Sequence, residues 1–207
     1  MPDYYEHHAD LFLSTTKDID MGMQYQMFLP YLDPGARILD AGCGSGRDSL
    51  AFLTLGFVVE AFDLSPSMVE AAKALTGLEV RCLSFQQMDY DAEFDGIWAC
   101  ASLLHVPKAE LAEVFGLLHR ALVDEGILYC SFKLRDTDFS QDGRHFTCFT
   151  PDSFQTFLHQ AGGFSLLLQK QSNDARPGRE HELWLNVVLR KTPASNQAPE
   201  EAGSTPR

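Results

Sequence analysis

Short apolar runs alternate along the chain with longer segments in which apolar residues recur every three or four positions. The runs cover about residues 36–41, 57–62, 78–83, 94–101 and 127–132. Runs of this length, bounded by turn residues, predict β-strands, and unbroken ones are typical of strands buried on both faces. The segments between them, residues 46–55, 65–76 and the stretch from Leu111 to Leu122, have helical spacing. Strands that alternate with helices predict a parallel sheet covered on both faces.

The last third of the chain departs from this alternation. Residues 133–150 have no clear period and predict a loop of about 18 residues, which is long enough to suggest a function. A helix is predicted from Pro151, with Phe154, Phe157 and Leu158 facing inward. Two strands follow, at about residues 164–171 and 182–190, with no full helix between them. We therefore predict an α/β fold with a mostly parallel seven-stranded sheet that ends in an antiparallel C-terminal hairpin.

The two ends of the chain differ from this central pattern. Residues 1–20 are polar and aromatic and have no place in the sheet, and a short helix with Met21, Tyr25 and Phe28 on one stripe follows them. Residues 192–207 are rich in Pro, Ala, Ser, Thr and Glu, which predicts a disordered tail. We predict one domain over residues 1–191, with residues 1–20 as a lid segment.

Composition narrows the class of protein. The chain has 207 residues, of which 45% are hydrophobic, and this fits one globular domain. A net charge of −13 argues against nucleic acid as a partner, because phosphate binding depends on clustered Lys and Arg. The 5 cysteines form no CxxC pair, and no signal peptide or membrane-length apolar stretch is present. We expect a cytoplasmic protein without a membrane partner. We also expect no metal site, because the adjacent His7 and His8 would point apart on a helix.

A glycine-rich turn follows the first predicted strand. In the segment Ile38-Leu-Asp-Ala-Gly-Cys-Gly-Ser-Gly46, three glycines alternate with other residues before a helix begins. Glycines permit positive φ angles and let the main chain approach a ligand closely. Asp63 ends the second strand, about 20 residues further on, where a carboxylate can accept hydrogen bonds from ribose hydroxyls. The alternative role for Asp63 is to cap the next helix, although Ser65 suits that role better.

These residues carry a family resemblance. The run from Ile38 to Gly46, followed by Asp63-Leu-Ser-Pro-Ser-Met68, resembles the class I S-adenosylmethionine-dependent methyltransferases over about residues 4–191. The resemblance implies a Rossmann-like, doubly wound fold and S-adenosylmethionine as the cofactor. It also implies that N-terminal aromatics cover the cofactor and that the turn after the third strand contacts adenine. Many family members have an acid in that turn, whereas this chain has Ser84 and Phe85.

The cofactor-binding residues expected from the motifs and from the resemblance lie at the carboxyl ends of the strands or in the N-terminal segment. They are Tyr5, Tyr25, Asp40, Gly42, Cys43, Gly44, Gly46, Asp63, Leu64, Met68, Ser84, Phe85, Cys100 and Ala101. Tyr5 and Tyr25 are lid candidates, with simple packing as the alternative. Cys43 is also interpreted as a small packing residue, the alternative being a reactive thiolate.

Methyl transfer from a sulfonium needs alignment, exclusion of water and, for a protonated nucleophile, a base. His105 is the candidate base, and a packing or capping role is its alternative. Arg144 with Phe146, and Arg176, are candidates for binding an anionic substrate, the alternative being solvated loop charges. Trp184 and Asn186 share one face of a strand and form a candidate substrate wall, although Trp184 also suits the core.

The expected function is transfer of a methyl group to a small-molecule acceptor by a monomer or homodimer. Two alternatives stay open at this point. The acceptor could instead be a macromolecule, protein or RNA, or the enzyme could use S-adenosylmethionine without methylating an acceptor.

Overall fold

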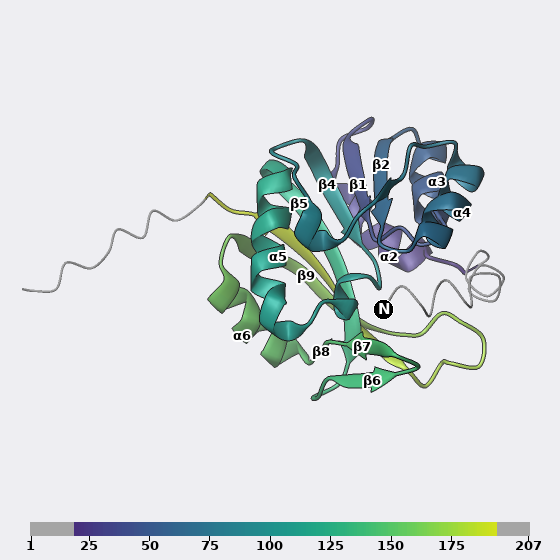
Figure 1. Ribbon diagram of the computed structural model, residues 1–207. Coiled ribbons are helices and arrows are strands. Elements are labelled where there is room, and N and C mark those ends of the chain that lie inside the picture. Colours follow the sequence, from purple (N-terminus) through teal and green to yellow (C-terminus); the bar gives the residue numbers. More distant parts are fainter. Residues whose placement is uncertain (1–18, 194–207) are drawn as a thin grey trace, which may run out of the picture.

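The computed structural model describes residues 19–193 and places a seven-stranded path at the centre of the molecule (Figure 1). The strands are β1 (Arg37–Ala41), β2 (Val58–Asp63), β3 (Arg81–Cys82), β4 (Phe94–Ala99), β5 (Leu122–Leu134), β9 (Phe164–Asn173) and β10 (Leu183–Lys191). They lie in the order β3-β2-β1-β4-β5-β10-β9. Pairs among the first five strands are parallel, whereas β10 is antiparallel to both β5 and β9. The predicted fold class and the antiparallel hairpin are confirmed.

Helices cover both faces of the sheet, because neighbouring strand residues point to opposite sides. In β1, Ile38 packs in the apolar cluster that includes Phe28 of α2 (Gly22–Phe28) and Phe52 of α3 (Arg47–Thr54). The next residue, Leu39, packs in the cluster that contains Leu118 of α5 (Lys108–Ala121) and Leu158 of α6 (Pro151–Ala161). A fifth helix, α4 (Pro66–Thr76), lies beside α3 in Figure 1.

The segment between β5 and α6 contains more structure than the long loop that the sequence predicts. Strands β6 (Phe139–Gln141) and β7 (Arg144–Phe146) form a separate antiparallel hairpin, and β8 (Cys148–Phe149) pairs with the end of β5. The prediction of an unstructured loop is therefore wrong. These strands have only two or three residues each, too few for a period to be visible in the sequence.

Two further boundaries differ from the prediction. Strand β5 begins at Leu122 and continues through the expected turn at residues 124–126, where Glu125 takes a φ of 61° and the pairing with β4 shifts register. Strand β3 is reduced to two residues. Leu75, which the helical spacing places inward, is 46% exposed because it lies near the end of α4.

The topology determines where a ligand can bind. Strand β1 pairs in parallel with β2 on one side and with β4 on the other, so the strand order reverses at β1. In open α/β sheets, ligands bind beyond the carboxyl ends of the strands at this reversal. Short 3-10 segments η2 (Phe85–Gln87) and η3 (Leu103–His105) follow β3 and β4 at that edge. No helix within residues 19–193 is long and apolar enough to cross a membrane.

Candidate active site

A cavity of about 540 Å³ lies where the parallel strands end, a volume typical of small-molecule sites. One part, the glycine-loop half, is formed by residues at or just beyond the carboxyl ends of β1 to β4, including Asp40, Gly42–Ser45, Asp63–Ser65 and Ser84–Gln86. The other part, the hairpin half, is formed by β5, β10, the β6–β7 hairpin and the loop between β9 and β10. It includes Lys133, Phe139, Arg144–Phe146, Asn173–Arg176, Arg179, Glu182, Trp184 and Asn186.

Asp63 holds the glycine loop in place. One of its carboxylate oxygens accepts a hydrogen bond from the Gly44 N–H at 2.8 Å, and the other accepts from the Ser65 N–H at 2.9 Å. Ser65 itself caps α4 through its Oγ, which accepts from the Met68 N–H at 3.4 Å. Asp63 thus connects the glycine loop to the start of α4 by hydrogen bonds. Ser65 is the N-cap residue that the sequence predicts. Each oxygen of Asp63 has a second lone pair, since a carboxylate accepts about four hydrogen bonds.

Close backbone packing explains the first and third glycines of the loop. Gly42 has a φ of 77°, and a Cβ there would lie 2.5 Å from the Cβ of Ser102, which follows β4. The Ser102 hydroxyl donates to the Ala41 carbonyl at 2.7 Å, so the ends of β1 and β4 are tied together. Gly46 has a φ of 81°, and a Cβ there would lie 3.0 Å from the Ala72 Cα of α4. Gly46 therefore packs α3 against α4 and does not line the cavity.

A buried charge cluster lies at the base of the glycine-loop half. Asp48 accepts hydrogen bonds from the Arg47 Nε and the Tyr25 hydroxyl, both at 2.7 Å, and from the Trp98 indole at 2.9 Å. Burial opposes the charge of Asp48, but Arg47 and these hydrogen bonds hold its pKa below the usual range. For Asp40, burial and the negative charge of Asp48 raise the pKa, although the Ser49 hydroxyl donates to its carboxyl at 2.6 Å. Sequence reasoning identified Asp40 but missed Arg47 and Asp48.

Tyr25 is part of this cluster. Its ring packs against Phe52 and Trp98, with centroid distances of 5.3 and 5.5 Å, and its hydroxyl is bound to Asp48. Tyr25 does not line the cavity, so its alternative interpretation as a packing residue fits the structure. Tyr5 lies outside the described residues.

Gln24 of α2 was also missed by sequence reasoning. Its side chain is 8% exposed and lines the cavity together with Asp40 and Asp48. Its Oε1 has no hydrogen-bond partner within the described part of the chain. A buried carbonyl oxygen without a donor is costly, which makes this atom a candidate acceptor for a ligand donor.

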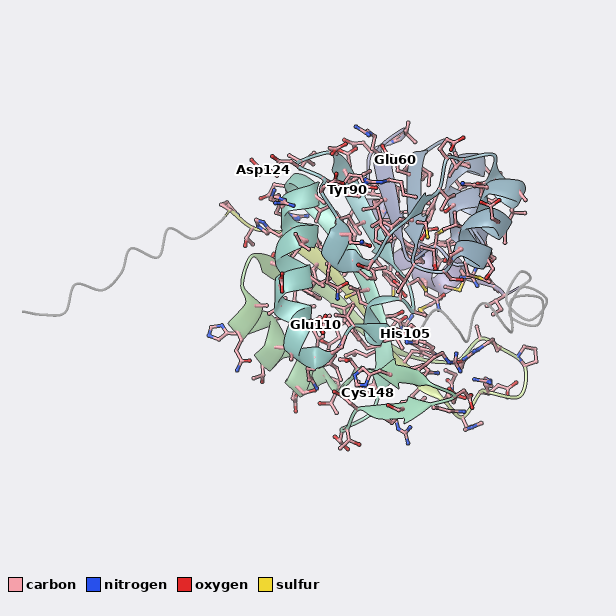
Figure 2. The ribbon with its side chains drawn as sticks, viewed as in Figure 1. Glu60, Tyr90, His105, Glu110, Asp124 and Cys148 are labelled. Atoms are coloured by element: carbon pink, nitrogen blue, oxygen red, sulfur yellow. The ribbon has the colours of Figure 1, made fainter. Side chains whose placement is uncertain are left out.

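His105 lines the cavity at the end of η3, where the sheet edge meets the β6–β7 hairpin (Figure 2). Its Nδ1 lies 2.8 Å from the His145 carbonyl oxygen, so Nδ1 carries the proton and donates it. The ring packs edge-on against Phe146 at 4.9 Å. Burial lowers the pKa of His105 to about 4, and the nearby charge of Arg144 acts in the same direction. The imidazole is therefore neutral near pH 7, with its lone pair on Nε2.

A charged network forms part of the hairpin half. Lys133 of β5 is 6% exposed and donates to Asp174 at 3.1 Å and to Glu182, with its ammonium 4.0 Å from the centroid of the Trp184 ring. Arg176 donates to both oxygens of Asp174, at 2.8 and 2.5 Å. Although burial opposes it, hydrogen bonds from Arg176 and Trp184 hold the pKa of Asp174 far below the usual range. Lys133 and Asp174 were not predicted as site residues.

The remaining predicted site residues within the described part of the chain line the cavity. Asn186 accepts from the Tyr129 hydroxyl at 2.7 Å and donates to Ser172 and Lys170, so its amide is occupied within the protein. Burial, together with Asp40 and Asp63, raises the pKa of Cys43 far above its usual range, which argues against a reactive thiolate. Also lining the cavity are Leu64, Met68, Ser84, Phe85, Cys100, Ala101, Arg144, Phe146, Arg176 and Trp184.

Comparisons with known proteins agree with this geometry. Residues 38–126 match the family model described as a methyltransferase domain. The chain is 40% identical to a ubiquinone biosynthesis O-methyltransferase of Xanthomonas campestris over 86 residues, which are 36% of this chain and 34% of that protein. It is 32% identical to the 24-methylenesterol C-methyltransferase 2 of Arabidopsis thaliana over 114 residues, 51% of this chain and 31% of that protein. The match thus spans about a third of the length of each of these relatives.

A solved structure extends the likeness to most of the fold. It is the 1,6-didemethyltoxoflavin-N1-methyltransferase of Burkholderia thailandensis, which superposes with a TM-score of 0.76 at 23% identity and covers 92% of this chain and 85% of that chain. The matched segment, residues 38–126, contains the glycine loop, Asp63 and His105. Residues 38–126 therefore match a methyltransferase domain, and the fold over most of the chain is similar to that of a solved methyltransferase.

Proposed function

We propose that this protein transfers a methyl group from S-adenosylmethionine to a small-molecule acceptor. The observation that carries the proposal is the glycine loop, held by Asp63, on the wall of a cavity formed by the ends of β1, β2 and β4. The second lone pairs of the Asp63 oxygens suit the two hydroxyls of a ribose. The buried Oε1 of Gln24, on the wall of the same cavity as Asp40, suits the positively charged amino group of the methionyl part. The residues of the glycine-loop half therefore fit this cofactor.

When bound, the cofactor supplies a methyl group on a positively charged sulfur, which is already an activated electrophile. The chain then has to hold the acceptor in line, keep water out and accept a proton where the nucleophile carries one. We propose that the Nε2 of His105 accepts that proton, because Nδ1 is held in its protonated form by the His145 carbonyl. Ser84 and Phe85 are proposed to contact the adenine ring, since both lie on the cavity wall after β3.

A small acceptor is favoured by the shape and charge of the molecule. The β6–β7 hairpin and the β9–β10 loop contribute to the cavity wall and leave one limited volume for cofactor and acceptor together. The net charge of −13 disfavours RNA. The names of two similar proteins, a ubiquinone biosynthesis O-methyltransferase and a 1,6-didemethyltoxoflavin-N1-methyltransferase, describe methyltransferases with small-molecule acceptors. We further propose a cytoplasmic location, which suits five cysteines that are all free thiols.

Isothermal titration of the full chain tests the cofactor assignment. We expect S-adenosylmethionine and S-adenosylhomocysteine to bind and NAD not to bind. The substitution Gln24→Leu should weaken S-adenosylhomocysteine binding by about 1.5–3 kcal/mol, the value of a hydrogen bond to a charged group. It should leave methylthioadenosine binding unchanged, because that compound lacks the amino-acid part. Gln26→Leu, on the exposed face of the same helix, is the matched control.

Activity is then sought by mass spectrometry with methyl-labelled S-adenosylmethionine and pooled metabolites. Label in a small-molecule product supports the proposed function. Label only in added protein or RNA would support a macromolecular acceptor instead. Consumption of cofactor without a labelled product would indicate chemistry other than methyl transfer, and binding of NAD alone would overturn the cofactor assignment.

A further inference from the structure

We propose that the acceptor is a planar aromatic compound with a negatively charged oxygen group, and that Arg144 binds this group beside His105. The inference rests on the proposed function and specifies the substrate class of the same cavity.

The charges on the cavity wall are unevenly distributed. Within the described residues, the hairpin half has four basic side chains, Lys133, Arg144, Arg176 and Arg179, and two acidic ones, Asp174 and Glu182. The glycine-loop half has one basic side chain, Arg47, and three acidic ones, Asp40, Asp48 and Asp63. A positive surface in a protein of net charge −13 attracts an anion, and it does so in the half away from the proposed cofactor site.

Three of the four basic groups are engaged by acids of the cavity wall itself. Lys133 and Arg176 pair with Asp174, and Arg179 approaches Glu182 at 3.5 Å. Arg144 pairs at 3.5 Å with Asp142, which is in the hairpin turn, is 54% exposed and does not line the cavity. The Arg144 side chain is only 12% exposed. Arg144 thus places a largely buried guanidinium on the cavity wall.

Aromatic rings surround this charge. Phe139 and Phe146 stack across the hairpin, with centroids 4.6 Å apart and planes within 5°. The Arg144 guanidinium lies 5.3 Å from the Phe146 centroid, and His105 lies edge-on to the same ring. Trp184 completes the aromatic wall of the hairpin half. Flat aromatic surfaces bind flat rings by stacking and edge contacts, while a guanidinium binds a carboxylate or phosphate through two parallel hydrogen bonds.

Arg144, the proposed binding residue for the acceptor's anionic group, lies near His105, the proposed base. Arg144 and His105 both line the cavity, and both contact Phe146. An anionic group held by Arg144 would therefore fix an attached ring next to the proposed base. This arrangement assigns Arg144 to orientation of the acceptor and His105 to the reacting atom.

The test uses ring compounds that differ in one property each. With the full chain saturated by S-adenosylhomocysteine, thermal shift and titration calorimetry are measured for benzoate, benzamide, benzylamine and cyclohexanecarboxylate. We expect benzoate to bind at least about tenfold more tightly than neutral benzamide, and cyclohexanecarboxylate to bind more weakly than benzoate. Benzylamine should not bind.

Arg144→Gln should abolish the preference for benzoate over benzamide while leaving S-adenosylhomocysteine affinity unchanged. Arg81→Gln is the matched control, because Arg81 also pairs with an exposed acid and lies over a ring, Tyr90, but is outside the cavity wall. Equal binding of benzoate and benzamide, binding of neither, or an unchanged preference in Arg144→Gln would overturn the inference. Loss of S-adenosylhomocysteine binding by the unmodified chain would instead contradict the proposed function.

Discussion

At the scale of single residues, the protonation of His105 is determined by burial more than by its neighbours. Desolvation lowers its pKa to about 4 although the hydrogen bond to the His145 carbonyl opposes this shift, and the charge of Arg144 adds to the lowering. The ring is consequently neutral well below physiological pH. A neutral ring with Nδ1 as donor is the form that a base requires, although a low pKa makes it a weak one.

Replacing His105 by Asn separates catalysis from packing. The Asn amide can still donate to the His145 carbonyl, as Nδ1 does at 2.8 Å, but it offers no basic nitrogen. We expect turnover to fall by about 10²- to 10⁴-fold, with S-adenosylhomocysteine affinity unchanged. Steady-state kinetics and calorimetry on the same preparation measure both quantities. A variant with native turnover per folded molecule would show that His105 only packs.

The sequence predicted local partnerships well and distant ones poorly. Asp63 and Ser65 lie two residues apart, and their roles follow from a strand end and a helix start that both leave signals in the sequence. Asp48 instead binds Tyr25 and Trp98, which lie 23 and 50 residues away. No sequence pattern indicates that Asp48, Tyr25 and Trp98 meet in the folded chain. Gln24 is missed for the same reason, because only the folded chain shows that its amide faces the cavity.

At the scale of elements, Lys133 connects three segments that close the hairpin half. It is the next-to-last residue of the long strand β5, and it binds Asp174, which directly follows β9, and Glu182, which directly precedes β10. Strand β10 also pairs Trp184 with Lys133 in the sheet. The β9–β10 loop is therefore fixed at its two ends by one ammonium group.

Replacing Lys133 by Met tests this connection. Met retains most of the apolar stem but leaves Asp174 and Glu182 with less compensating charge, so we expect a loss of about 3 kcal/mol in unfolding free energy. Lys73→Met removes the exposed pair with Glu70 and should cost less than about 0.5 kcal/mol. Urea denaturation of both variants gives the comparison. Equal stability of the two would show that the buried network contributes nothing.

Elements with a clear period were predicted closely, and those without one were not. The strands at residues 37–41 and 58–63 and the helix at residues 108–121 follow continuous or amphipathic patterns. The β6–β7 hairpin has three residues in each strand, with Asp142 and Gly143 in the turn at positive φ. Asp-Gly is a hairpin turn signal, and it was the one local clue to this element.

At the scale of the whole molecule, stability against pH is a balance between groups of opposite behaviour. Asp48, Asp174 and Glu182 are buried to different degrees, which opposes their charge, but their cationic partners lower their pKa values. These three carboxylates therefore stabilise the fold at neutral pH and lose that contribution as the pH falls. Burial of His105 acts in the same direction between about pH 6.5 and 4. Asp40 acts oppositely, because burial and Asp48 raise its pKa. The folded protein keeps a proton on Asp40 that the unfolded chain releases.

Asp40→Asn isolates that opposing contribution. Because the folded state binds the extra proton, the contribution of Asp40 to the unfolding free energy should fall as the pH rises above the unfolded pKa of 3.8, until the raised folded pKa is passed. Within that window the slope approaches about 1.4 kcal/mol per pH unit. The Asn amide can still accept the Ser49 hydroxyl but does not titrate, so the variant should gain stability relative to the native chain with increasing pH. Urea denaturation at about pH 5 and about pH 8 measures the difference, with Asp33→Asn at an exposed carboxylate as the control. A difference between native and Asp40→Asn proteins that stays constant with pH would mean that Asp40 is ionised in the folded state, with its charge compensated by Arg47.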